Sequence, residues 1–169
     1  MSWERELELL ALAREDTCDA TLSKMYLDDP GKLRRWIRLY LAEQSNRGRL
    51  KKTYDGVPRL ETHSAGIREL ICDEIEFLLS ESRLTFNIRM EQLQEGWRVK
   101  QFKFHLHLPG RRIQMIRIHL NQARGRDELN VPRCHLHIGD SQAHIPFPIM
   151  SPMLMIHLIC ENLEPYLGV

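Results

Sequence analysis

Histidines gather in one part of the chain and alternate there with apolar residues. Six of the eight histidines fall between His105 and His144, in the segments 104–108, 118–120 and 134–138 and at His144 itself. Successive side chains of an extended strand point to opposite faces, so each segment predicts a strand with histidines on one face and apolar residues on the other. Imidazole binds metals and transfers protons at neutral pH, so this face is the leading candidate site.

One chemistry open to such a face is phosphodiester cleavage or RNA binding without a metal. Histidines that titrate near neutrality act as acid and base, and nearby cations stabilise developing charge. The candidate catalytic residues are His119, His135, His137 and Arg117. The candidate nucleic-acid contacts are cations of this face, of the loop beside it and of an upstream basic segment: Lys103, Arg117, Arg133, Arg124, Arg126, Lys32, Arg34, Arg35 and Arg38. The predicted partner is therefore RNA or another polyanion, bound through its backbone.

A second chemistry is a metal site. Two histidines at i and i+2 on a strand, joined by a third from the next strand, supply three imidazoles and leave a position for water. His119, His135 and His137 are the favoured triplet, and Asp140 or His144 could add or orient a ligand. The Asp-His of the metallo-β-lactamase motif and the glutamate spacing of a cupin are both missing. The sequence therefore favours a protein without bound metal or other cofactor, and it leaves open whether the chain is an enzyme.

A third interpretation makes the histidines structural and the chain a non-catalytic module that binds a protein partner. Residues 30–52 carry eight cations against the single anion Glu43. This basic segment fits an acidic protein surface as well as a polyanion, and it can also pair within the fold.

Composition places the chain among globular proteins. It has 169 residues, a net charge of +1, 43% hydrophobic and 28% charged residues, which suffice for a sizeable core. The apolar stretches are too short to span a bilayer and the first residues lack a signal-peptide layout, so we expect a cytoplasmic protein without a membrane partner. The cysteines are far apart and are expected as buried free thiols: Cys18, Cys72, Cys134 and Cys160.

The fold class expected from periodicity and turn residues is α+β. Residues 1–64 are predicted as an N-terminal helical region with the basic segment and a loop, and residues 65–169 as an α-β-β-β-β-α domain. The predicted helices cover 1–28 (one long or two short), a segment capped by Asp29-Pro30, about 65–82, and about 152–163. Residues 44–64 are predicted as an irregular connection with a small hairpin.

Four strands are predicted as an antiparallel meander in the order 1-2-3-4, with the last helix on the apolar face. Their approximate ranges are 84–91, 97–108, 112–121 and 132–139. Phase slips in the alternation predict bulges near Lys100-Gln101 and Met115-Ile116. The predicted core is Phe86, Ile88, Phe102, Phe104, Leu106, Ile116, Ile118, Leu136, Ile138, Leu154 and Ile159.

The expected register determines which histidines meet. It places Arg117 beside Lys103, His119 beside Gln101, His135 near His119, and His137 near Arg117. His105 and His107 are then expected further away, toward the tip of the hairpin.

Two resemblances add expectations. The segment 132–138, with 144–148 and a closing helix, resembles the end of TumE-like toxin components of toxin–antitoxin pairs. That resemblance implies a small toxin that acts on RNA or translation and is neutralised by an antitoxin partner. The element order, with Asn130-Val131-Pro132 near the proline segment, is similar to ubiquitin-conjugating and RWD-type domains. The chain has no cysteine in the exposed segment after the predicted sheet, where such enzymes keep their nucleophile. The resemblance therefore implies a protein-binding scaffold or complex subunit.

Overall fold

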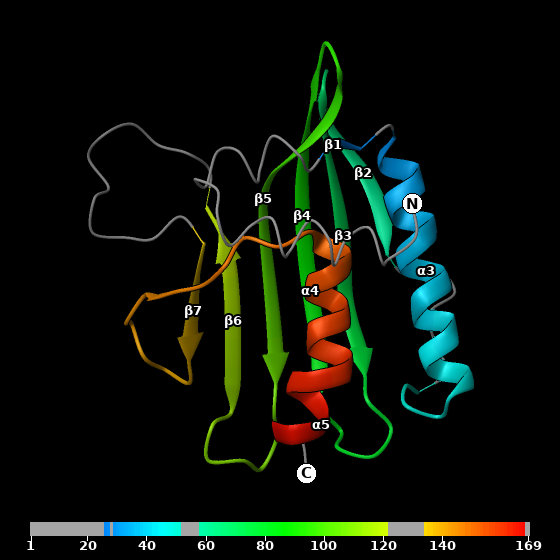
Figure 1. The fold of residues 1–169 in the computed structure, drawn as a ribbon. Helices are drawn as coiled ribbons and strands as arrows, with labels where there is room; N and C mark the ends of the chain where they lie inside the picture. Colours follow the sequence, from blue (N-terminus) through cyan, green and yellow to red (C-terminus); the bar gives the residue numbers. More distant parts are fainter. Residues whose placement is uncertain (1–25, 28, 52–57, 122–133, 168–169) are drawn as a thin grey trace.

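The computed structural model describes residues 26–27, 29–51, 58–121 and 134–167, which form an α+β fold of one antiparallel sheet with helices against one face (Figure 1). In chain order the elements are β1 (Tyr26–Leu27), α3 (Pro30–Asn46), β2 (Arg59–Ser64), β3 (Ile67–Glu76), β4 (Arg83–Leu93), β5 (Gly96–His107), β6 (Met115–Leu120), β7 (Cys134–Ile138), β8 (Ile145–Pro146), α4 (Pro152–Leu158), a π-helical turn η1 (Ile159–Leu163) and α5 (Glu164–Leu167). No helix of these ranges is long and apolar enough to cross a membrane.

The sheet is larger than expected. Its strands follow one another from β2 to β8 in chain order, each neighbouring pair antiparallel, and β1 pairs with β5. The predicted meander is confirmed as β4, β5, β6 and β7. The expected four-stranded sheet is too small, because β2 and β3 extend one edge and β8 the other. The helices expected over residues 1–28 lie outside the described residues, except that Tyr26–Leu27 is strand rather than helix.

The prediction of a helix over residues 65–82 is wrong. This segment contains strand β3, which pairs with β2 and β4. Leu70 and Cys72 are buried at a spacing of two, and the register then shifts between Cys72 and Ile75. This bulge puts Ile75 on the buried face three residues after Cys72, a spacing that imitates an amphipathic helix. Pairing with two neighbouring strands overrides the local pattern. The irregular connection expected up to residue 64 likewise ends in a strand, β2.

Both predicted flanking helices are confirmed, and local sequence explains where they begin. The Asp29 side chain caps α3, whose residues Leu33, Ile37 and Leu41 form one buried stripe. The Ser151 hydroxyl accepts a hydrogen bond from the Leu154 N–H in the first turn of α4, and the helical chain continues through η1 and α5. Both helices thus present an apolar stripe to the same sheet face.

The core lies between these helices and the even-numbered residues of β4, β5 and β6. The predicted core set is buried except for Leu136, which is half-buried, and Ile138, which is 37% exposed. Both exceptions lie on β7, beyond the part of the sheet that α4 covers in Figure 1. Three cysteines are buried free thiols as predicted, namely Cys72, Cys134 and Cys160, and Cys18 lies outside the described residues.

One of the two predicted bulges is confirmed. The β4–β5 register shifts between Arg89 and Met90, which leaves Lys100 as the extra residue of β5. The bulge expected at Met115-Ile116 is wrong, because β5 and β6 pair without a shift. The preceding Ile113 lies in the turn before β6, so its phase does not need to match the strand.

Candidate metal centre

The histidines lie on the sheet face opposite the helices. In β5 after its bulge, and in β6 and β7, even-numbered side chains belong to the apolar face, and odd-numbered side chains project from the other, here called the histidine face. Strand pairing arranges this face in two rows: Lys103, His119 and His135 in one, and His105, Arg117 and His137 in the next. The predicted pairing of β6 with β7 is thereby confirmed.

The predicted pairing of β5 with β6 is wrong by two residues. The prediction placed Arg117 beside Lys103 and His119 beside Gln101. In the structure His119 lies beside Lys103 and Arg117 beside His105. The turn is the cause. The Leu108 N–H donates to the Gln114 carbonyl at 2.9 Å, which closes a longer turn than the two-residue Pro-Gly turn on which that register was based.

Three histidines converge at the centre of the face, as the favoured triplet predicted. One ring nitrogen from each of His119, His135 and His137 lies within 4.8 Å of the other two. The ring centroids are 4.9 Å apart for His135 and His137, and 5.5 and 5.3 Å from His119 to each of them. A tetrahedral ion bound at about 2.0–2.1 Å needs nitrogens about 3.4 Å apart, so the three nitrogens lie near the spacing of a metal site but must move closer to share an ion.

Two more histidines border this triplet. His105 Nε2 lies 2.9 Å from His119 Nε2, which corrects the expectation that His105 is distant. The exposed His144 ring lies 4.6 Å from the rings of both His135 and His137. With the triplet, these two form a five-histidine cluster among the described residues.

Burial favours the neutral form of three histidines of the cluster. Burial, followed by the surrounding imidazoles, lowers the pKa of His119 to about 3. Burial, followed by the charge of Arg117, lowers the pKa of His105, and burial followed by His135 lowers that of His137. A neutral ring keeps a lone pair on one nitrogen, and this is the form that ligates a metal.

One nitrogen of the triplet is buried without a hydrogen bond to the described part of the chain. His137 is 6% exposed, and its Nδ1 has no hydrogen-bond partner among the described residues. Buried polar atoms nearly always have one, so such an atom points to a bound ion or water. The neighbouring His135 is likewise buried, at 2% exposure, so both rings of β7 are held within the protein.

Arg117 holds the chain segment that follows β7. Its Nη2 donates to the carbonyl oxygens of Gly139 and Ser141, at 3.2 and 3.3 Å. These bonds hold the connection between β7 and β8, which carries His144. We therefore interpret Arg117 as a positioning residue, although the sequence suggested it for catalysis.

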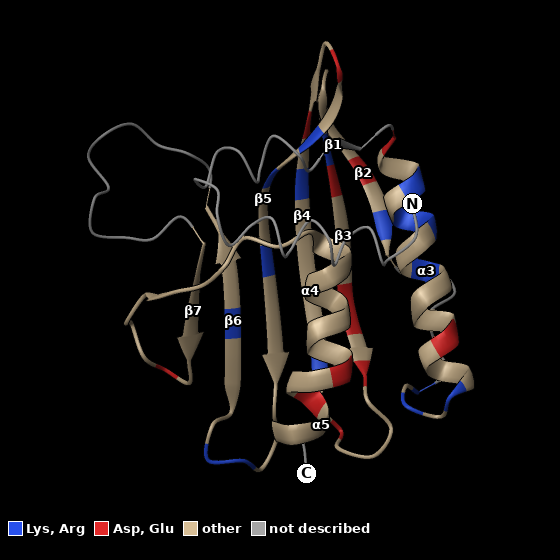
Figure 2. Cartoon of the chain, in the orientation of Figure 1, with Lys and Arg blue, Asp and Glu red and all other residues tan. Residues whose placement is uncertain are grey.

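The histidine face is positively charged around the cluster. Strands β5, β6 and β7 contain no Asp or Glu, and Figure 2 shows blue bands on β5 and β6 and no red on any of the three strands. Lys103 is exposed and forms no ion pair with any residue in the described ranges. Among the described residues, Lys103 and Arg117 are the predicted nucleic-acid contacts that the structure places beside the histidines.

The predicted nucleic-acid contacts of α3 do not join this face. Lys32, Arg34, Arg35 and Arg38 lie on α3, which packs on the opposite side of the sheet. Of these, Arg34 donates to the Pro58 carbonyl at 2.9 Å. The remaining three lie outside the described residues: Arg124, Arg126 and Arg133.

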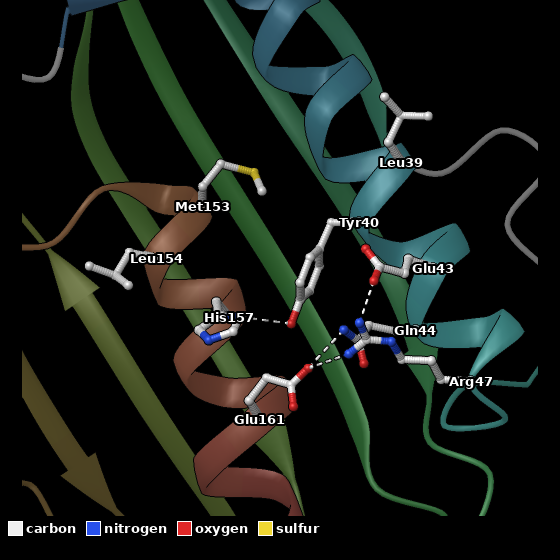
Figure 3. Close-up of a pocket in the computed structure, with 9 residues that line it drawn as sticks. All are labelled: Leu39, Tyr40, Glu43, Gln44, Arg47, Met153, Leu154, His157 and Glu161. Carbon is white, nitrogen blue, oxygen red and sulfur yellow. Dashed lines mark hydrogen bonds and ion pairs between the residues drawn. The ribbon is translucent and has the colours of Figure 1, made fainter. Parts of the chain in front are cut away.

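A separate pocket of about 450 Å³ lies between α3 and α4 (Figure 3). Its polar groups mostly pair with each other: Tyr40 with His157 Nδ1 at 3.3 Å, and Gln44 Nε2 with Glu161 at 2.9 Å. Burial, followed by Cys160 and Glu161, raises the pKa of Tyr40. We interpret this pocket as the junction of the two helices, because it lies across the sheet from the histidine cluster.

Comparison with known proteins leaves the two resemblances to TumE-like toxin components and to RWD-type domains as predictions. No protein-family model matches the chain, and neither a curated protein nor a solved structure is significantly similar to it.

Proposed function

We propose that the protein binds a divalent transition-metal ion through His119, His135 and His137 and uses it in hydrolytic chemistry. The observation that carries this proposal is the convergence of three imidazoles from two adjacent strands. Strand pairing fixes the backbone of all three ligands, so the donor set is largely formed before any ion binds. The buried Nδ1 of His137, which has no hydrogen-bond partner among the described residues, supports the same conclusion.

The donor set favours zinc. Nitrogen ligands alone suit Zn²⁺, Cu²⁺, Ni²⁺ and Fe²⁺ better than Mg²⁺ or Ca²⁺, which prefer oxygen. Three protein ligands are typical of catalytic zinc centres, in which the fourth position holds a water whose pKa falls to about 7. On this proposal His119, His135 and His137 hold the ion, His105 orients His119, and Arg117 holds the segment that carries His144.

Elemental analysis of protein purified without a histidine tag tests the proposal. After incubation with Zn²⁺ and removal of unbound ion, we expect about one equivalent per chain, because one triplet of imidazoles holds one ion. His119→Asn should lose most of this zinc. His107→Ala is the matched control, because His107 is an exposed histidine of β5 outside the cluster, and it should keep the full equivalent.

Circular dichroism separates loss of a ligand from loss of the fold. His135→Ala empties a buried position, so it is informative only where its spectrum matches that of the parent protein. A folded parent that retains no transition metal would overturn the proposal. Equal zinc content in His119→Asn and His107→Ala would overturn the assignment of the ligands.

A further inference from the structure

We propose that the metal centre takes a phosphate group as its anionic ligand and that Lys103 binds this group beside the ion. The inference rests on the proposed function, because it assigns the substrate class of the same centre. It is carried by the charge of the histidine face and by the position of one lysine.

The charge balance of the centre calls for an anion. Three neutral imidazoles leave a divalent ion with its full charge, strands β5, β6 and β7 contain no carboxylate, and the exposed Asp140 lies in the connection after β7. Arg117 adds another cation in the next row. A site with this excess of positive charge binds an anion more tightly than a neutral ligand.

Lys103 is the cation free to meet that anion. Of the three cations on β5, Arg98 and Lys100 both form ion pairs with Glu91, whereas Lys103 forms none with a described residue. Lys103 is the cross-strand partner of His119, and such partners have Cβ atoms about 4.5–5.5 Å apart. The flexible lysine stem can therefore bring its ammonium group to a ligand bound on the ion.

Phosphate fits the two charges better than a carboxylate. Its tetrahedral oxygens can contact the ion and the ammonium group at once, and lysine is a common phosphate ligand that acts as a point charge. A phosphate group can come from a small phosphate ester or from an RNA backbone, and the local chemistry is the same for both.

The test uses full-length protein loaded with Co²⁺, whose visible spectrum reports its ligands. Titration with inorganic phosphate should change the spectrum of the loaded parent protein. Lys103→Met keeps the length of the side chain and removes its charge, so it should weaken phosphate binding about tenfold while metal content stays unchanged. Lys103→Arg should recover most of the affinity. Arg112→Met removes an exposed cation of the β5–β6 turn and should bind phosphate like the parent.

A second titration with a labelled single-stranded RNA distinguishes the two sources of phosphate. A backbone that contacts several cations gives an affinity that falls steeply with salt, whereas a single bound phosphate group gives a shallow dependence. Either slope supports the proposal when Lys103→Met weakens binding.

Three results would overturn the inference, and they distinguish its failure from that of the proposed function. If the loaded protein shows no response to phosphate, or if Lys103→Met binds phosphate like the parent, this inference fails and the metal centre stands. If the parent binds no Co²⁺ or Zn²⁺, the proposed function fails and the inference fails with it.

Discussion

His119 of β6 and His135 of β7 are cross-strand partners whose ring centroids lie 5.5 Å apart. The hydrogen bonds of the ladder set their separation, so this relationship does not depend on the conformation of a loop. His137 follows His135 on the same strand and the same face, which completes the triplet. A site built on paired strands holds its ligands more rigidly than one built on loops.

His105 should tune the metal centre without being required for it. The contact between His105 Nε2 and His119 Nε2 orients the His119 ring, and loss of such an orienting residue typically costs about 10–100-fold in metal affinity. We expect His105→Ala to weaken zinc binding within that range in chelator competition and His105→Gln, which keeps a hydrogen-bonding group, to restore part of it. Unchanged affinity in His105→Ala would show that the contact has no such role.

The basic stripe of α3 should be independent of the histidine face. Lys32, Arg35 and Arg38 are exposed on a helix that packs on the other side of the sheet. We expect reversal of all three charges to glutamate to leave phosphate affinity at the metal centre unchanged within about twofold, because bulk water and salt screen charges at such separations. A loss of phosphate affinity as large as that in Lys103→Met would contradict the independence of the stripe from the histidine face. Loss of a co-purifying protein partner would instead assign the stripe to protein binding.

Glu161 should stabilise the protein at neutral pH and lose this effect in acid. Burial alone would raise the pKa of Glu161, but hydrogen bonds from Arg49 and Gln44 hold it below its usual value. A carboxylate with a lowered folded-state pKa stabilises the fold above its unfolded pKa of about 4.3, and this stabilisation disappears as the pH falls through the folded pKa. Glu161→Gln should therefore lower the free energy of unfolding at pH 7 by about 1 kcal/mol, and by less at pH 3.

Urea unfolding of both proteins at the two pH values measures this difference. Glu95→Gln serves as the control, since Glu95 is exposed in the β4–β5 turn and should give no pH-dependent change. If Glu161→Gln lowers the free energy of unfolding by the same amount at pH 7 and at pH 3, the charge of Glu161 is not the source of the stabilisation.

The aromatic centre of the core should dominate stability. Phe104 is 1% exposed, and its ring centroid lies 5.4 Å from those of Phe86 and Phe102. Phe104→Ala should cost about 3–5 kcal/mol in the free energy of unfolding, since the cavity cannot close around two fixed rings. Leu79, 93% exposed, gives the contrast, and Leu79→Ala should change stability by less than about 0.5 kcal/mol.

The sequence correctly predicts the elements whose residue periodicity agrees with the strand pairing and helix caps of the structure. The alternation of β4 to β7 gives the meander and its faces, and the Asp29 and Ser151 caps give the starts of two helices. Strand β3 escapes prediction because its bulge before Ile75 changes a period of two into a helical spacing.

Within the site, the triplet is predictable and its surroundings are not. The short β7 offers few alternative registers that keep its apolar face inward, so His119 and His135 meet as expected. His105 was misplaced because the β5–β6 register depends on a turn whose length is not evident from the Pro109-Gly110 pair. The burial of His137 depends on packing that no local pattern encodes.

Anomalous diffraction at the zinc edge from crystals of the zinc-loaded protein tests the central claim most directly. We predict one strong peak on the histidine face, about 2.0–2.1 Å from one ring nitrogen of each of His119, His135 and His137. The absence of a peak at the triplet in crystals of the loaded protein, or a peak held by other residues, would contradict the account.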